Sequence, residues 1–325
     1  MKDRVKIGVI GAGYWGEKVI REYLQLSKES CAAALSMVCD TRDERLSYCE
    51  KVLGISPERL SNDYTKLIAS QDVDAVHICT PNDTHYRICK EALRAGKHVL
   101  LEKPMTLKAA QAYELVDIAE RSAVCLQVGH IFRFTNVLKK VRELIKQGFF
   151  GEIYYLKIQW TTLMNPSPKR DIIFDLGPHP IDISNFILGL WPKKVNCKAR
   201  PYRRKRQEEI AYLIMEFDGK LLVHVELSWL QPGKTRKLTI VGSKRCATID
   251  CLGQTIEVYE NGDGAMYEIG VEKNNTILTE INHFVESILG NERSNNPGPV
   301  GAKNVEILEY AKKSLLEEKT KRIPR

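Results

Sequence analysis

The chain has 325 residues, of which 43% are hydrophobic and 28% charged, so it is long enough for two domains and has a globular rather than a disordered composition. No apolar run approaches the length that spans a membrane, so no membrane association is expected. The net charge of +8 suits an anionic ligand such as a nucleotide, and no nucleic-acid partner is expected.

The nine cysteines are an odd number and include no C-x-x-C pair. Several lie in apolar, strand-like runs, where a thiol behaves as a small hydrophobic group. This usage is typical of a reducing, cytoplasmic compartment, and it predicts neither a disulfide framework nor a metal site. The first residues lead directly into an apolar run, so no signal peptide is expected.

A glycine-rich loop follows the first predicted strand, Val5–Ile10, and a helical pattern follows the loop. Its glycines have G-x-G-x-x-G spacing, which holds a dinucleotide pyrophosphate at a helix N-terminus. The first glycine permits the tight turn, the second leaves room for the phosphates, and the third lets helix and strand pack closely. The predicted cofactor-binding residues of this loop are Gly11, Gly13, Tyr14, Trp15 and Gly16.

An aspartate ends the second predicted strand, 35–39. Asp40 lies 24 residues after Gly16, close to the spacing of about 20 at which an acid holds the ribose hydroxyls. A carboxylate here would repel the 2′-phosphate of NADP and favours NAD, although Arg42 could offset that repulsion. The alternative is an aspartate that only forms a turn.

Strands and helices alternate up to residue 127, with further strands at 75–79, 98–101 and 124–128. This order predicts a doubly wound parallel sheet, in which ligands bind beyond the carboxyl ends of the strands. Asp40, Thr80 and Lys103 all fall at such ends. The sequence therefore predicts a dinucleotide-binding α/β domain, a Rossmann fold, over residues 1–127.

Residues 128–325 are predicted to form a second, α+β domain, because strands there follow one another and imply a large, mostly antiparallel sheet. Two helices close the chain at about 275–289 and 302–319, and the last can pack back on the first domain. The basic segment 200–206 is interpreted as a solvated loop, with phosphate binding as the alternative. The predicted strands of this domain are 153–160, 212–217, 221–229, 237–241, 247–250 and 255–259.

Several motifs together resemble the Gfo/Idh/MocA oxidoreductases over both domains: the glycine loop, Thr80-Pro81-Asn82 with His85, 95–99, Glu102-Lys103-Pro104 and 175–182. The resemblance implies an NAD(P)-dependent dehydrogenase of sugars, inositols or nucleotide sugars. It also implies an open second sheet that supplies substrate contacts and the interfaces of a homodimer or homotetramer. By this resemblance the cofactor also contacts Thr80, Asn82, His85, Glu102 and Lys103.

Two further segments are similar to a subgroup that oxidises the 3-hydroxyl of UDP-N-acetylglucosamine: 128–136, and Arg170-Asp171 ahead of the 175–182 motif. The chain departs from that subgroup at Phe132, where a charged residue is expected, and at Pro180, where an acid or small polar residue is expected. The residues predicted to bind substrate are Lys103, His130, Arg133, Arg170 and Asp182. For Arg133 a structural salt bridge is the alternative, and for Asp182 it is helix capping.

Alcohol oxidation needs a group that stabilises charge on the oxygen and a base that takes the proton. The resemblance assigns Lys103 to the oxygen and His179 to the proton, with Asp175 as a nearby catalytic carboxylate. Since Pro180 is well suited to the first helical position, His179 is predicted at the N-cap, where the helix dipole favours a neutral imidazole. The alternatives are a surface lysine and a capping histidine.

Three functions stay open from the sequence. The first is an NAD-dependent sugar or nucleotide-sugar dehydrogenase, in its narrowest form a UDP-N-acetylhexosamine 3-dehydrogenase. The second is an inositol or simple sugar dehydrogenase. The third is a binding protein that senses NAD or a sugar without turnover.

Overall fold

The computed structural model describes residues 4–29, 32–166, 170–262, 264–290 and 293–324. The chain divides into two compact units. Unit 1 comprises Met1–Ile131 and Asn275–Val305, and unit 2 comprises Phe132–Asn274 and Glu306–Arg325. The C-terminal part of the chain is therefore divided: Asn275–Val305 belongs to unit 1, and Glu306–Arg325 belongs to unit 2. The sequence analysis placed a single domain boundary at residue 127.

Unit 1 contains a six-stranded sheet in the order β3-β2-β1-β4-β5-β6, and all of its pairings are parallel. The strands are short and mostly buried, which is typical of a parallel sheet covered on both faces. The predicted doubly wound fold is confirmed. The strands are β1 Val5–Ile10, β2 Ala33–Cys39, β3 Leu60–Ser61, β4 Ala75–Ile78, β5 His98–Glu102 and β6 Leu126–Gly129.

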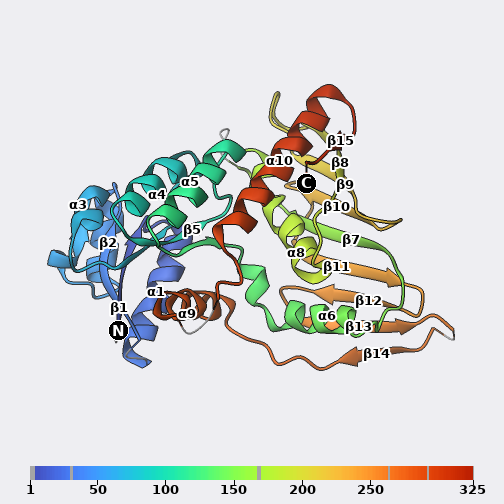
Figure 1. Cartoon of the computed structure of the whole chain (residues 1–325), viewed down its shortest axis with the longest axis horizontal. Coiled ribbons are helices and arrows are strands. Elements are labelled where there is room, and N and C mark those ends of the chain that lie inside the picture. Colours follow the sequence, from blue (N-terminus) through green and yellow to red (C-terminus); the bar gives the residue numbers. More distant parts are fainter. Residues whose placement is uncertain (1–3, 30–31, 167–169, 263, 291–292, 325) are drawn as a thin grey trace. The chain divides into compact units, whose positions relative to one another are not determined.

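Helices cover both faces of this sheet (Figure 1). α1 and α9 pack together on one face, and α4 and α5 pack together on the other. Phe284 and Ile281 of α9 join the buried core formed by β1, β2 and α1. A helix far along the chain, α9, therefore supplies part of the core of unit 1. The sequence analysis had named only the last helix as one that can pack on the first domain. The helices are α1 Tyr14–Glu29, α2 Asp43–Lys51, α3 Tyr64–Ala69, α4 His85–Arg94, α5 Ala109–Arg121 and α9 Thr276–Leu289, with short turns η1 Pro57–Arg59, η2 Asn82–Thr84 and η3 Ile131–Phe134.

Unit 2 is built on a nine-stranded sheet in the order β14-β13-β12-β11-β7-β10-β9-β8-β15. Only β7 and β10 pair in parallel among these described strands, so the prediction of a mostly antiparallel sheet is confirmed. The strands are β7 Ile153–Thr162, β8 Lys194–Arg200, β9 Ile210–Glu216, β10 Leu222–Ser228, β11 Lys234–Gly242, β12 Arg245–Asp250, β13 Thr255–Glu260, β14 Met266–Ile269 and β15 Lys321–Arg322.

Four helices accompany this sheet: α6 Asn136–Lys146, α7 Ile172–Leu176, α8 Pro178–Leu188 and α10 Gly298–Glu317. α7 contacts β9 and β10, and α6 contacts α8. A Cβ atom at Gly177, between α7 and α8, would lie 3.0 Å from Leu308, so α10 packs closely against this junction. The junction carries the 175–182 motif.

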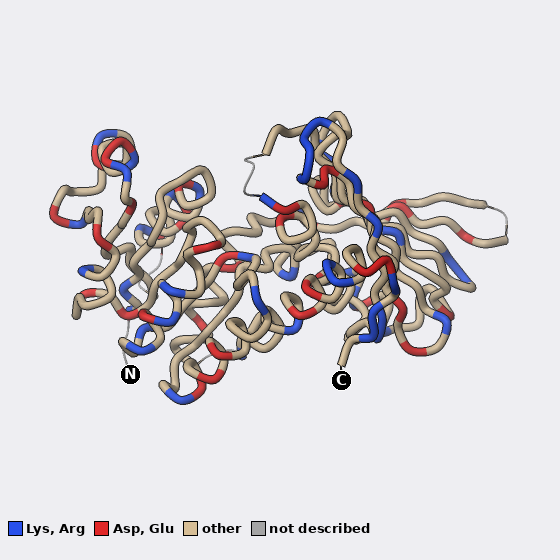
Figure 2. The backbone as a smooth tube through the Cα atoms, turned by 90° about the horizontal axis from the view of Figure 1, so that it is seen from above, with Lys and Arg blue, Asp and Glu red and all other residues tan. Residues whose placement is uncertain are grey.

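Charges are mixed over both units. Figure 2 shows Lys and Arg interspersed with Asp and Glu along the backbone of each unit. In the basic segment 200–206, Arg203 pairs with the buried Glu209 at 2.6 Å and Arg204 donates to Asn165. The segment runs from the end of β8 toward β9 and most of its residues are exposed, which fits the interpretation of a solvated loop.

No helix in the described ranges is long and apolar enough to cross a lipid bilayer. The eight cysteines within those ranges carry free thiols, and Cys31 lies outside them.

Candidate active site

The glycine loop is packed as tightly as its spacing predicts. Gly11 has φ +97°, and a Cβ atom there would lie 2.7 Å from the carbonyl oxygen of Cys79. A Cβ atom at Gly16 would lie 1.8 Å from the carbonyl oxygen of Gly11. At Gly13 the nearest atom is Nη2 of Arg42, 3.6 Å away, so the space above this residue is open to a ligand. This loop fits a dinucleotide pyrophosphate at the N-terminus of α1.

Asp40 lies at the carboxyl end of β2, as predicted, and its side chain is buried. Its carboxylate accepts hydrogen bonds from the Ala12 backbone N–H at 2.8 Å and from the Arg42 backbone N–H at 3.0 Å, and Nε of Arg42 lies 3.1 Å away. Burial alone would raise the pKa of Asp40, but the bonds from Arg42 and Ala12 outweigh it and hold the pKa below its usual value. Asp40 therefore holds the glycine loop in place as well as offering an ionised carboxylate.

His85 bridges the loops that follow β4 and β5. Its ring nitrogens lie 2.9 Å from the carbonyl oxygens of Pro104 and Thr80, and the side chain is fully buried. Burial lowers the pKa of His85 despite these two carbonyl groups. Thr80 also accepts a hydrogen bond from the Thr84 hydroxyl at 2.7 Å, and Asn82 begins η2 beside it. The described contacts of His85 are with the backbone, and its contact with cofactor stays a prediction.

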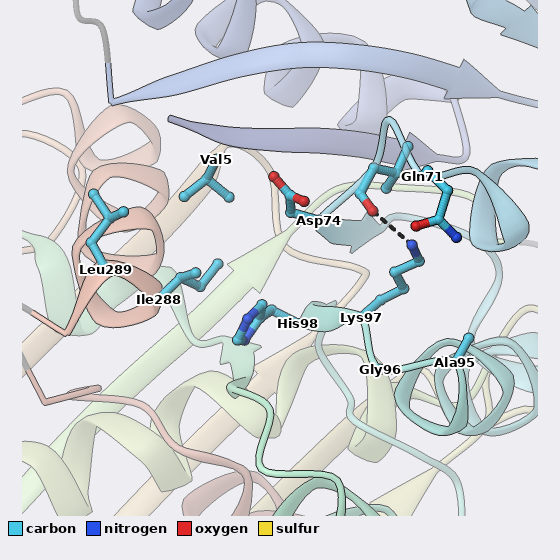
Figure 3. Close-up of a pocket in the computed structure, with 10 residues that line it drawn as sticks. Val5, Gln71, Asp74, Ala95, Gly96, Lys97, His98, Ile288 and Leu289 are labelled. Carbon is cyan, nitrogen blue, oxygen red and sulfur yellow. Dashed lines mark hydrogen bonds between the residues drawn. The ribbon is translucent and has the colours of Figure 1, made fainter. Parts of the chain in front are cut away.

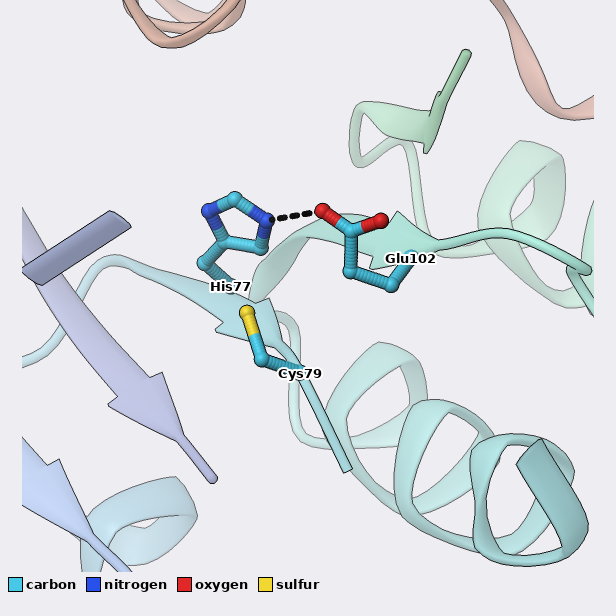
Figure 4. A group of neighbouring side chains, drawn as sticks. All are labelled: His77, Cys79 and Glu102. Atoms are coloured by element: carbon cyan, nitrogen blue, oxygen red, sulfur yellow. Dashed lines mark hydrogen bonds and ion pairs between the residues drawn. The ribbon is translucent and has the colours of Figure 1, made fainter. Parts of the chain in front are cut away.

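Glu102 ends β5 next to Lys103, and its carboxylate is buried. Nε1 of Trp15 donates to Oε1 of Glu102 at 2.5 Å, and Nε2 of His77 lies 3.2 Å from the same oxygen (Figure 4). The bond between Lys103 and Pro104 is cis. His77 is not among the site residues predicted from the sequence, and its contact with Glu102 was not foreseen.

His77, Cys79 and Glu102 offer metal-ligand atom types within 4.8 Å of one another. Burial raises the pKa of the Cys79 thiol well above its usual value. The Glu102 carboxylate already faces two N–H groups. These contacts favour a hydrogen-bonded cluster over a metal site.

In unit 2 the position predicted for His179 is wrong by two residues. α8 begins at Pro178 with Gly177 as its N-cap, so His179 is the second residue of the helix. Pro180 and Asp182 are correspondingly the third and fifth residues, which removes the capping role considered for Asp182. The reason is local: Pro178 provides the first helical position as well as Pro180 does, and Pro180 falls in the first turn, where no N–H is needed.

Aromatic rings surround His179. Its ring centroid lies 5.1 Å from that of Phe132, edge to face, and 5.6 Å from that of Trp160. Phe132, the position at which the chain departs from the subgroup, also contacts Trp160 with a centroid distance of 4.7 Å. These contacts fix the plane of the imidazole from two sides. Trp160 was not identified from the sequence because an aromatic residue in a strand is typical of any core.

Asp175 is the fourth of the five residues of α7, and its side chain is buried. Nη2 of Arg170 lies 2.6 Å from its carboxylate, and the Arg170 side chain is 45% exposed, so solvent or a ligand can reach this arginine. Asp171 caps α7 by accepting the Ile173 backbone N–H at 2.9 Å. Lys312 of α10 binds the other oxygen of Asp171 at 2.6 Å.

A second arginine, which the sequence did not reveal, lies in the same unit. Arg236 is buried in β11, donates to the carbonyl oxygen of Thr161 at 2.8 Å and lies 4.9 Å from the Trp160 ring. Burial lowers the pKa of Arg236 to about 10, and the charge of Asp175 opposes this change. Trp160 thus has a histidine and a cation as neighbours.

Arg133 and Asp182 form a buried ion pair with a separation of 2.7 Å. Arg133 also donates to Oδ1 of Asn185 at 2.6 Å. These described contacts are the salt bridge named as the alternative for Arg133, and a substrate role for either residue stays a prediction. His130 follows β6 and is buried, and its backbone N–H donates to Val128 at 2.7 Å.

A cavity of about 490 Å³ lies at the amino ends of β1 and β5 in unit 1, the edge of the sheet opposite the glycine loop (Figure 3). Val5, Asp74 and His98 line it, with Ile288 and Leu289 of α9. Nζ of Lys97 donates to the carbonyl oxygens of Ser70 and Val73 at 2.8 and 2.7 Å. Because dinucleotides bind at the carboxyl ends of such strands, this cavity does not belong to the cofactor site.

Two family models match the chain. The Gfo/Idh/MocA oxidoreductase family model, with its NAD-binding Rossmann fold, matches residues 5–130. The Gfo/Idh/MocA C-terminal domain model matches residues 138–248. Together they cover the glycine loop, Lys103 and the residues around His179.

The chain is 27% identical over 293 residues to the UDP-N-acetylglucosamine 3-dehydrogenase of Acidithiobacillus ferrooxidans, which covers 87% of this chain and 88% of that protein. The solved structure of that enzyme matches with a TM-score of 0.84 and 25% identity, over 96% of this chain and 98% of that chain. The chain is also 27% identical over 334 residues to the myo-inositol 2-dehydrogenase of Thermotoga maritima, over 97% of each protein.

Proposed function

Because the chain belongs to the Gfo/Idh/MocA oxidoreductase family, we propose that it is an NAD-dependent dehydrogenase that oxidises a secondary hydroxyl of a sugar or nucleotide sugar. The observation that carries this proposal is the composition of one sheet edge in unit 1. The open glycine loop, the ionised Asp40 and the turn at Lys103 follow the carboxyl ends of β1, β2 and β5, which belong to one parallel sheet in which β4 separates β1 from β5. That edge is where an α/β sheet binds its ligand.

The residues at this edge fit a nicotinamide dinucleotide. The loop from Gly11 to Gly16 would hold the pyrophosphate, and Asp40 the adenosine ribose. When bound, the nicotinamide supplies a hydride acceptor. The chain itself must hold the substrate carbon in position and manage the hydroxyl proton.

We assign two residues to the reacting hydroxyl of the substrate, one to its oxygen and one to its proton. Lys103 holds the substrate oxygen with its ammonium and stabilises the charge that develops there. His179, in the first turn of α8, takes the hydroxyl proton, since the positive end of the helix dipole favours a neutral imidazole. Asp175, held by Arg170, is the carboxylate that we assign to orient the base or a substrate hydroxyl. These roles are proposals.

For the substrate, we favour a UDP-N-acetylhexosamine oxidised at C3. The Acidithiobacillus enzyme supports this choice, and so does Arg170, a half-exposed cation able to pair with a phosphate. The Thermotoga relative supports an inositol or simple sugar as the second candidate. A sensor without turnover would need neither Lys103 nor His179.

The test is the absorbance of the reduced nicotinamide when the protein is mixed with NAD and a panel of UDP-sugars, free sugars and inositols. A ketone trap is present because the oxidation equilibrium can be unfavourable. We expect NADH with UDP-N-acetylglucosamine. NADH formed with inositol or a free sugar would support the proposed reaction but exclude a nucleotide sugar as the substrate. Tight NAD binding without turnover of any substrate would favour the sensor.

The choice between NAD and NADP can be tested at Asp40 and Arg42. Replacing Asp40 with Ala removes the acceptor for the ribose hydroxyls and the repulsion of a 2′-phosphate, so we expect the affinity ratio of NAD to NADP to fall about tenfold or more. Replacing Arg42 with Ala is expected to raise the ratio, because Arg42 would otherwise attract that phosphate. Calorimetric titration of each variant with both dinucleotides checks this. A ratio that neither variant changes would contradict the role of Asp40.

We also propose that unit 2 mediates a homodimer or homotetramer through the open face of its sheet. Tyr155, Tyr212, Ile214 and Leu222 are each 41–47% exposed on neighbouring strands β7, β9 and β10. Exposed apolar side chains gathered on neighbouring strands are typical of an interaction surface. The test is analytical sedimentation of the wild type and of Ile214→Lys. We expect the variant to sediment as an assembly of lower mass than the wild type. A monomeric wild type would refute the proposal.

A further inference from the structure

A buried hydrogen-bond network joins the glycine loop to the strand that ends at Lys103. Trp15, the second residue of α1, donates its indole N–H to Glu102 at 2.5 Å. His77 of β4 lies 3.2 Å from the same carboxylate oxygen through Nε2. Its other ring nitrogen, Nδ1, lies 3.4 Å from the hydroxyl of Tyr23. Three elements, α1, β4 and β5, therefore meet at one carboxylate.

The chemistry of the network assigns its protons. Burial raises the pKa of Tyr23 well above its usual value, so this residue keeps its O–H and can donate it to Nδ1 of His77. With Tyr23 as the donor to Nδ1, Nε2 is the ring nitrogen that carries the proton donated to Glu102. The Tyr23 and His77 rings also meet edge to face, with centroids 5.9 Å apart, which fixes the ring plane.

Glu102 is held in one place and in one charge state. Burial alone would raise its pKa, but the bonds from His77 and Trp15 and the charge of Lys103 lower it. A Cβ atom at Gly129 of β6 would lie 2.8 Å from Oε2, so the carboxylate also packs against the backbone. Among the other titratable groups of this region, Cys79 and Glu280 of α9 act on Tyr23 electrostatically, and His85 interacts electrostatically with Glu102 and Lys103. The described side-chain N–H donors to Glu102 are those of Trp15 and His77.

On the basis of the proposed dehydrogenase function, we propose that Trp15 and His77 are positioning residues for Lys103. They fix the Glu102 carboxylate at the end of β5, which acts on the adjacent Lys103 through its charge and through the backbone that the two residues share. The ammonium of Lys103 is thereby kept charged and in place for the substrate oxygen. Since Trp15 belongs to the loop that fits the pyrophosphate, the same network connects cofactor binding to the catalytic lysine. Loss of either N–H donor then affects Lys103 without removing any group that touches the substrate.

The experiment uses four variants of the full chain. Trp15→Phe and His77→Leu each remove one N–H donor to Glu102. Each substitution leaves an apolar side chain in the space of the original one. His77→Gln places an amide N–H where it can reach Glu102 and is the conservative rescue. Cys79→Ser is the matched control, because Cys79 lies in the same cluster and has no hydrogen bond to Glu102 among the described contacts.

The first readout is the reactivity of Lys103 itself. The protein, with saturating NAD, is treated with an amine-acylating reagent at pH 8, and modification of Lys103 is followed by peptide mass spectrometry. We expect the rate to rise about tenfold in Trp15→Phe and His77→Leu, since the amine would lose its proton about one pH unit more easily. The rate should stay at the wild-type value in His77→Gln and Cys79→Ser.

The second readout is kcat with the best substrate of the panel, beside the dissociation constant for NAD. We expect kcat to fall about 100-fold in Trp15→Phe and His77→Leu, the loss typical of a reacting group that is displaced by about 1 Å. In His77→Leu the affinity for NAD should be unchanged, because His77 is fully buried and its described contacts are with Tyr23 and Glu102, not with the glycine loop. A purely structural role would instead lower kcat and affinity together.

Equal acylation rates of Lys103 in the wild type, Trp15→Phe and His77→Leu would overturn the proposal. If His77→Leu does not fold, Trp15→Phe decides, since Trp15 is only half-buried. If the wild type oxidises no substrate, the proposed function fails, but the acylation rates still show whether the network controls Lys103. The two failures are therefore distinguishable.

Discussion

Replacing Lys103 with alanine is expected to slow hydride transfer by about three orders of magnitude and to leave the affinity for NAD almost unchanged. The residues that fit the dinucleotide, the glycine loop and Asp40, lie on β1, α1 and β2, whereas Lys103 follows β5. Lys103 would act on the oxygen only as charge develops, so its loss affects the transition state and not cofactor binding. Removal of one such group costs about 10³-fold in kcat.

The measurement is single-turnover formation of NADH, beside calorimetric titration with NAD. Lys108→Ala is the matched control, because Lys108 is an exposed lysine five residues further along the chain. We expect it to retain wild-type rates. Equal loss of NAD affinity and of hydride transfer in Lys103→Ala would contradict the assignment and would make Lys103 a cofactor-binding residue only. Full activity would remove it from the mechanism.

The parts of the fold that the sequence predicted are those set by local patterns. The strand, glycine loop and helix of unit 1 depend on short-range periodicity and on glycines whose missing side chains are sterically required. The mostly antiparallel sheet followed from successive strands. β8, Lys194–Arg200, was missed although its buried positions alternate, because small Cys and Ala side chains between lysines give a weak hydrophobic signal.

The contacts of the candidate site depend on residues far apart in the sequence, and these could not be predicted. Trp15 and Glu102 are 87 residues apart, and Arg133 and Asp182 are 49 apart. A buried histidine such as His77 looks the same in sequence whether it is a core residue or a donor to a functional carboxylate. The family resemblance named Glu102 and Lys103, but only the structure shows what holds Glu102.

Alanine at Gly16 and at Gly13 is expected to have different effects, although both glycines belong to one motif. At Gly16 the new Cβ atom would lie 1.8 Å from the Gly11 carbonyl oxygen, and backbone cannot yield as a flexible side chain does. We expect Gly16→Ala to lose about 3 kcal/mol of unfolding free energy and NAD binding with it. At Gly13 the nearest atom is 3.6 Å away, so Gly13→Ala should fold with wild-type stability.

The affinity for NAD decides what the space above Gly13 is for. If a pyrophosphate approaches the backbone there, the methyl group of Gly13→Ala should lower that affinity about tenfold or more, equivalent to about 1.4 kcal/mol, without a change in Tm. Thermal unfolding and NAD titration of both variants are the measurements. Gly270→Ala is the control, because nothing lies within 4 Å of its added Cβ atom. Undiminished NAD affinity in Gly13→Ala would show that the dinucleotide does not bind against this loop, and the cofactor assignment would then fail at its central residue.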